Sequence, residues 1–115
     1  MIDDWTTTKL RQIRDTARES CDFVEGLHSE DFVTDAQIHK ACSMNLIIIG
    51  EAAKRIFERA PELVGQTPDI PWREMAGMRN RIAHDYEKID LQTVWDTVAE
   101  LLPELIVQID QLLSR

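Results

Sequence analysis

The chain has 115 residues, of which 43% are hydrophobic and 30% charged, and its formal net charge is −8. Such a length and apolar content suit one hydrophobic core, so we expect a single domain over residues 1–115 and exclude a disordered protein. The longest purely apolar run, residues 46–49, is too short to span a membrane, and the acidic N-terminus lacks a signal-peptide pattern, so we expect a cytoplasmic protein without membrane contact.

The first predicted helix runs from about Thr6 to Gly26. Apolar side chains recur there every three or four residues and form one stripe, which is typical of an amphipathic helix. Gly26 fits the helix end. His28 is expected in an exposed loop that follows.

The second predicted helix runs from a capping box at residues 34–37, with Thr34 as its first member, to about Ala60. Gly50 lies in the middle of this helix, where it costs roughly 1 kcal/mol relative to alanine. A helix keeps such a glycine most readily where another helix passes close. We therefore expect a close neighbour at Gly50.

Three prolines, Pro61, Pro68 and Pro71, indicate an exposed connector after the second helix. Pro71 suits the first position of a third helix, which we expect to continue to about Tyr86. Trp72, at its start, is predicted to pack in the core.

Asp90 is the predicted N-cap of the last helix. Pro103 lacks an amide donor, so this helix should be kinked or broken at residues 101–103. Together these segments predict an all-α fold, an antiparallel up-and-down bundle of four main helices. The apolar stripe of the last helix is broad, so part of it is expected to face a second copy of the chain.

The third helix divides its side chains between two faces. At about 100° per residue, Arg79 emerges from the apolar face beside Met75 and Ile82. Asn80 and His84 stand one turn apart on the polar face, where they can contact each other. Chemically different groups are thus concentrated on one short helix.

An arginine in an apolar stripe costs free energy unless it forms an ion pair with a nearby anion. Glu51 lies in an apolar stretch of the second helix. We expect it to pair with Arg79 or Arg81 and to fix that side chain. A solvated Glu51 is the alternative.

Positive charge is scarce, and it is concentrated around this helix. Residues 73–88 carry four basic and three acidic side chains, whereas the rest of the chain carries nine basic and eighteen acidic ones. The overall charge argues against broad nucleic-acid binding. Arg81 and Arg73 remain candidates to attract a phosphate backbone.

The string from Pro71 to Tyr86 contains Arg79, four residues, then His84, with Asn80 after the arginine and Tyr86 two residues beyond the histidine. It resembles the Arg-x4-His-x-Tyr motif of HEPN-domain ribonucleases, in particular the HepT-like branch. The segment at residues 49–55 resembles that branch too. The likeness covers nearly the whole chain, in order.

The resemblance implies a HEPN-like fold and a twofold homodimer that brings two copies of the motif into one cleft. It implies the toxin of a type VII-like toxin–antitoxin system, with a minimal nucleotidyltransferase as antitoxin. That partner would attach AMP to Tyr86. Asp85 and Glu51 are expected to support the site.

The residues of the motif suit metal-independent cleavage of RNA. His84 can act as base or acid near neutral pH, and Arg79 can hold phosphate oxygens. Asn80 can orient His84 or contact the phosphate. No metal-ligand spacing or phosphate-cradling glycine loop is present, so we expect neither metal nor cofactor. Cys21 and Cys42 are expected to be free thiols.

Two other interpretations stay open. The chain could be a non-catalytic subunit that binds nucleotide or RNA for a nucleotidyltransferase. It could also be a structural dimer whose polar motif only satisfies buried charges. Arg79→Ala and His84→Ala would then lower the melting temperature, whereas in a ribonuclease they would cost activity.

Overall fold

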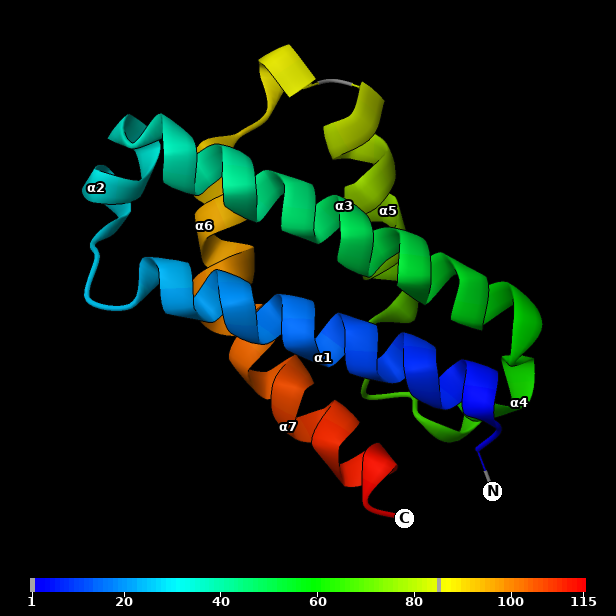
Figure 1. Ribbon diagram of the computed structural model, residues 1–115. Coiled ribbons are helices and arrows are strands. Elements are labelled where there is room, and N and C mark those ends of the chain that lie inside the picture. Colours follow the sequence, from blue (N-terminus) through cyan, green and yellow to red (C-terminus); the bar gives the residue numbers. More distant parts are fainter. Residues whose placement is uncertain (1, 85) are drawn as a thin grey trace.

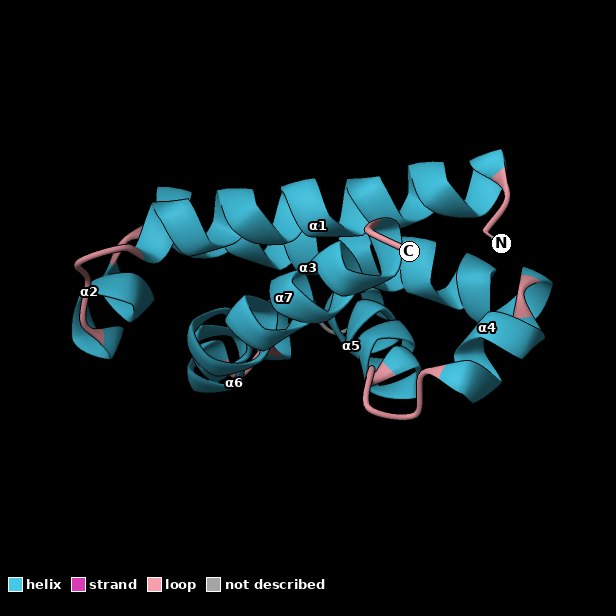
Figure 2. Ribbon diagram, turned by 90° about the horizontal axis from the view of Figure 1, so that it is seen from below, coloured by secondary structure: helices cyan, strands magenta, loops and turns pink. Residues whose placement is uncertain are grey.

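The structure is a computed structural model that describes residues 2–84 and 86–115. Two long helices, α1 (Asp4–Val24) and α3 (Ala36–Arg59), lie side by side and run in opposite directions (Figures 1 and 2). The motif helix α5 (Trp72–His84) packs against α3 on the side away from α1. The predicted all-α bundle is confirmed.

The last predicted helix consists of three parts. These are α6 (Leu91–Asp96), a π-helical segment η2 (Thr97–Leu101) and α7 (Leu102–Leu113). The wider π turn ends two residues before Pro103, whose ring has no N–H and crowds the preceding carbonyls. The predicted interruption is confirmed, and it extends over the whole turn before the proline. Asp90 caps α6 as expected and accepts the Gln92 N–H at 3.0 Å.

A short helix, α2 (Ser29–Thr34), occupies part of the expected loop after α1. Because α2 ends at Thr34, the N-cap of α3 is Asp35, which accepts the Ile38 N–H at 3.1 Å. The Thr34 hydroxyl instead donates to the Glu30 carbonyl oxygen at 3.1 Å, within α2. The predicted capping box with Thr34 as the cap is therefore wrong by one residue.

The connector after α3 is partly helical and partly buried, which corrects the prediction of an exposed one. It contains α4 (Pro61–Gln66), and Leu63 and Ile70 lie in the core. Pro71 lies just before α5 rather than at its first position. Trp72 is buried as predicted, and its indole N–H donates to the Thr67 hydroxyl at 3.0 Å.

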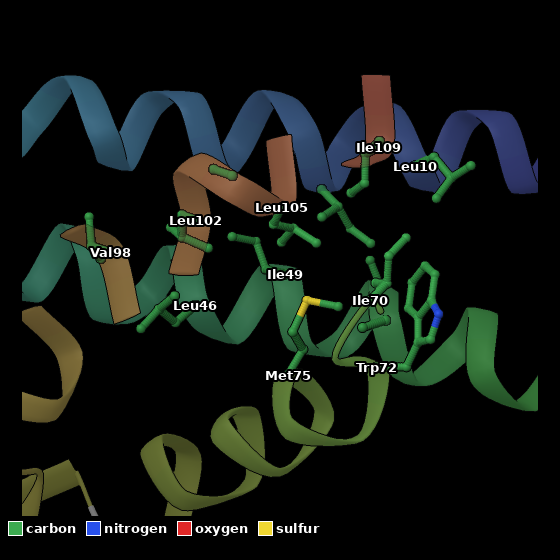
Figure 3. Packing of buried hydrophobic residues seen from close by; sticks show 14 of the residues in the cluster. Leu10, Leu46, Ile49, Ile70, Trp72, Met75, Val98, Leu102, Leu105 and Ile109 are labelled. Atoms are coloured by element: carbon green, nitrogen blue, oxygen red, sulfur yellow. The ribbon is translucent and has the colours of Figure 1, made fainter. Parts of the chain in front are cut away.

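The core lies between the α1–α3 pair and the helices that cover it (Figure 3). Leu10 from α1, Ile49 from α3 and Leu105 from α7 meet there, and each is at most 1% exposed. Both α5 and η2 add side chains to the same cluster, so the motif helix is anchored along its buried face. At the surface, Asp110 of α7 pairs with Arg14 and Arg18 of α1 at 3.2 and 2.8 Å.

Among the described residues, no helix combines the length and the apolar character needed to cross a membrane. The two chain ends lie near each other at the α4 end of the bundle (Figures 1 and 2). In Figure 1 this is the side opposite the segment that joins α5 to α6.

Candidate active site

Gly50 lets α5 approach α3 closely. A β-carbon at Gly50 would meet the Met75 carbonyl oxygen at 2.6 Å and would collide with the side chain of Arg79. The close neighbour expected at this glycine is therefore the motif helix itself. Trp72, Met75 and Ile82 are the buried residues of α5, and they hold its apolar face on the core.

Arg79 forms the predicted ion pair with Glu51. Its Nε lies 3.1 Å from Glu51 Oε2, and the two side chains are 30% and 36% exposed. Both of these atoms are shielded from solvent, and they face each other as charges rather than in an aligned hydrogen bond. Of the two partners considered for Glu51, the structure selects Arg79 and excludes the solvated alternative.

Two further contacts fix this pair. Glu51 Oε1 also accepts a hydrogen bond from Arg55 Nε at 3.3 Å, one turn along α3. Asn80 Oδ1 accepts from Arg79 Nη1 at 3.0 Å. Among the described residues Asn80 makes this bond to the guanidinium and none to His84, and its predicted contact with a phosphate stays a prediction. Among the described residues, Arg79 Nη2 makes no hydrogen bond, so it can donate to a ligand.

His84 is the last residue of α5, and its side chain is exposed. It follows Asn80 by four residues and Arg81 by three, so all three side chains lie at neighbouring positions on the helix surface. Arg81 is exposed as well. The end of α5 therefore presents an imidazole and the guanidinium of Arg81 at neighbouring positions. Arg79, five residues before His84, lies about 140° away from it around the axis of the same helix.

Arg73 lies apart from this group. It is eleven residues before His84, which corresponds to about 16 Å along a helix axis. Its guanidinium lies over the ring of Phe57, 5.5 Å from the ring centre. A role of Arg73 in binding substrate stays a prediction, and it would concern a phosphate distant from His84.

Two further predicted site residues, Asp85 and Tyr86, follow His84 in the sequence. Asp85 and the side chain of Tyr86 lie outside the described residues. The backbone of Tyr86 begins a short 3-10 helix, η1 (Tyr86–Lys88), which leads away from α5. The predicted support by Asp85 and modification of Tyr86 therefore remain predictions.

Sequence reasoning missed two features near the motif. The first is Arg55, although its position four residues after Glu51 on one helix is a usual sign of an ion pair. The second is a pocket of about 350 Å³ between the end of α5 and the start of α6. It could not be found from the sequence, because its walls come from separate elements. Its lining residues are Met78, Arg81, Ile82, Lys88, Ile89, Asp90, Thr93 and Val94.

A larger hollow of about 770 Å³ lies near the chain ends, between α1, α4 and α7. It contains none of the motif residues, so its size does not make it the reaction site. The two cysteines are free, as expected, and lie on α1 and α3. Burial raises the pKa of the Cys42 thiol to about 11, which makes it a poor nucleophile.

The arrangement at the end of α5 can act on a phosphodiester. Arg79 is always cationic and is held in place from two sides, so it is prepared to meet negative charge. His84 is exposed, so its imidazole is accessible to a ligand. One chain supplies one imidazole at this place, whereas acid–base cleavage uses a proton acceptor and a proton donor.

Comparison with known proteins adds independent findings. The sequence matches the family described as Ribonuclease HepT-like over residues 13–112. A candidate RNase of Caldanaerobacter subterraneus subsp. tengcongensis is 34% identical over 101 residues, covering 84% of this chain and 88% of that protein. A protein of Thermococcus cleftensis named probable ribonuclease HepT is 40% identical over 84 residues, covering 73% of this chain and 74% of that protein. No solved structure matches the chain.

Proposed function

Because the chain belongs to the HepT-like ribonuclease family and is an endoribonuclease by that membership, we propose that it is the toxin of a toxin–antitoxin pair. In this proposal it cleaves RNA without metal, in a cleft shared by two copies of the chain. A minimal nucleotidyltransferase neutralises it by adding AMP to Tyr86.

The observation that carries the catalytic part is a fixed guanidinium and an exposed imidazole on the same short helix. Arg79 is held by Glu51 at 3.1 Å and by Asn80 at 3.0 Å, and His84 is exposed at the end of the same helix. A preorganised cation stabilises developing negative charge without having to reorganise during the reaction. This is the property that a phosphoryl-transfer site needs.

Cleavage would proceed by internal transesterification. A neutral His84 takes the proton of the ribose 2′-hydroxyl, and the freed oxygen attacks the adjacent phosphorus. The bond from phosphorus to the 5′-oxygen breaks, and a protonated His84 of the second chain gives its proton to that oxygen. The products are a 2′,3′-cyclic phosphate and a 5′-hydroxyl. Arg79 balances the charge on the phosphate oxygens.

A homodimer supplies the second imidazole. The stripe of α3 that leads to Glu51 has an apolar surface suited to such contact, because Met44 is 55% exposed and Ile48 is half-buried. These residues precede Glu51 by seven and three positions, so they lie on the same side of the helix. A second chain seated there would bring its own motif close to this one.

Modification of Tyr86 would block the cleft by charge and bulk. An attached AMP brings a negative phosphodiester two residues after His84. That group would compete with RNA phosphate for Arg79 and Arg81. A co-expressed nucleotidyltransferase would transfer the adenylyl group of ATP to the Tyr86 hydroxyl and release pyrophosphate. It should therefore add the mass of one adenylyl group, AMP less water, to wild-type chain and none to Tyr86→Phe.

Growth and RNA cleavage test the proposal together. Induced expression of the chain alone should arrest growth, and His84→Ala should not.

Purified protein should cleave RNA in excess EDTA and leave 2′,3′-cyclic phosphate ends. It should sediment as a dimer, and a monomer at micromolar concentration would contradict the shared cleft. Equal arrest by His84→Ala would show that the imidazole is not needed.

A further inference from the structure

We propose that the pocket between the end of α5 and the start of α6 binds one base of the RNA strand, adjacent to the phosphate that is cleaved. In this role it sets the sequence preference of cleavage. We call it the base pocket. The inference rests on the proposed ribonuclease activity and adds a subsite to it.

The base pocket has an apolar lining suited to a planar ring. Ile82 and Val94 are buried, with 2% and 1% of their surface exposed, while Met78 and Ile89 are half-buried at its walls. Methionine is flexible and polarisable, so it adapts to an aromatic ring. A base can lie against these side chains and lose contact with water, which favours binding.

Positive charge surrounds the opening. Arg81 and Lys88 line the pocket and are exposed. Asp90 also lines it, but its carboxylate already accepts the Gln92 N–H at 3.0 Å and the Thr93 hydroxyl at 3.1 Å. In a chain of net charge −8, an opening lined by two cations and one carboxylate carries a net positive charge and attracts an anionic ligand. A nucleotide combines the base and the phosphate that these two regions fit.

The base pocket lies beside the proposed reaction centre. Arg81, on its wall, precedes His84 by one turn of α5, which places the two β-carbons roughly 5–6 Å apart. A phosphate held between Arg81 and His84 would leave the base of the neighbouring nucleotide at the opening. The pocket is therefore placed to read a nucleotide next to the cut.

Size and chemistry favour a base over a protein segment. The volume of about 350 Å³ is near the lower end of the roughly 300–1,000 Å³ found for small-ligand sites. Single-stranded RNA is recognised by unstacked bases that lie against arginine planes and apolar side chains. Arg81 offers the guanidinium plane, and the Thr93 hydroxyl, whose proton is donated to Asp90, can accept a hydrogen bond from the base edge.

Methyl NMR tests binding without relying on cleavage. His84→Ala protein, labelled at methionine and isoleucine methyls, is titrated with each of the four nucleoside 3′-monophosphates and with inorganic phosphate. The signals of Met78 and Ile89 should shift with nucleotides and not with phosphate alone. One base should bind about tenfold more tightly than the poorest, which corresponds to one well-formed hydrogen bond.

A matched pair of variants tests whether the nucleotide-dependent methyl shifts come from binding in the base pocket. Thr93→Phe places a ring at the pocket wall and should abolish the shifts, whereas Gln92→Phe, exposed on the same turn but outside the lining, should preserve them. Equal melting temperatures would show that both variants fold. Shifts that survive in Thr93→Phe, or absent shifts with all four nucleotides, would overturn the base pocket.

Sequencing of cleaved ends then separates this inference from the proposed function. Wild type acting on random-sequence RNA should prefer one base at a fixed position beside the cut. Thr93→Phe should still cut, with that preference lost, and Gln92→Phe should keep it. Cleavage with the same preference in Thr93→Phe would contradict the base pocket alone. Nucleotide-dependent methyl shifts without any cleavage would contradict the ribonuclease proposal alone.

Discussion

Gly50 and Gly77 are both glycines inside helices, and their surroundings predict opposite effects of the same substitution. Gly50→Ala forces a β-carbon against Met75 and Arg79, which should destabilise the fold by about 1–3 kcal/mol. At Gly77 nothing lies within 4 Å of an added β-carbon, so Gly77→Ala should stabilise it by about 0.5–1 kcal/mol. Urea denaturation of both variants measures the difference. A stabilising Gly50→Ala would refute the close approach of α5.

Glu51 positions Arg79, so its charge should matter more for rate than for stability. Glu51→Gln keeps the shape and removes the counter-charge, and we expect kcat for RNA cleavage to fall about tenfold with little change in KM. The melting temperature should change little, because both side chains are about one-third exposed.

Arg55→Gln provides the control for that variant. It removes the other cation on Glu51 and leaves the Arg79 pair intact, so cleavage should stay near the wild-type rate. Equal losses of kcat in Glu51→Gln and Arg55→Gln would show that the local charge balance matters rather than the position of Arg79.

At the scale of elements, the two candidate caps of α3 can be separated by substitution. Asp35→Ala removes the acceptor of the Ile38 N–H and should cost about 0.5–2 kcal/mol of stability. Thr34→Ala removes only an exposed hydroxyl bond inside α2 and should cost less than about 0.5 kcal/mol. Thermal denaturation of the two variants decides between them. A larger loss of stability in Thr34→Ala than in Asp35→Ala would show that Thr34 is the cap, as the sequence suggested.

The sequence predicts the long elements well because their apolar stripes repeat over many turns. The stripes of α1, α3 and α7 fixed their approximate extents, and Pro103 marked the interruption before α7. The helices α2 and α4 have six residues each, which is too short for a helical period to stand out. The misplaced cap at Thr34 follows from missing α2.

The same distinction holds for the candidate site. The Arg79–Glu51 pair could be predicted because a charge in an apolar stripe requires a partner, and Glu51 was the carboxylate in a comparable setting. The bond from Arg79 to Asn80 was missed because it depends on side-chain rotamers. The base pocket was missed because it depends on how the turn at η1 places α6 against α5.

At the scale of the whole molecule, the buried thiol of Cys42 couples folding to alkaline pH. Its pKa is about 11 in the fold against an ordinary 9.0, so the folded state retains the proton more strongly. The contribution of this thiol to the free energy of unfolding is fully present below pH 9. It falls by up to about 3 kcal/mol as the pH rises towards 11, because the unfolded chain loses the thiol proton first. The free energy of unfolding should therefore fall more steeply between pH 9 and 11 in wild type than in Cys42→Ala. Parallel curves would show that the thiol is not desolvated.

Both chain ends lie at the α4 end of the bundle, on the side of Figure 1 opposite the turn between α5 and α6. A tether at either end would therefore point away from His84. The protein can be immobilised on a sensor chip or joined to a fluorescent reporter through either terminus, with the end of α5 left open to solution. RNA binding to single immobilised molecules can then be recorded without changing the helical bundle.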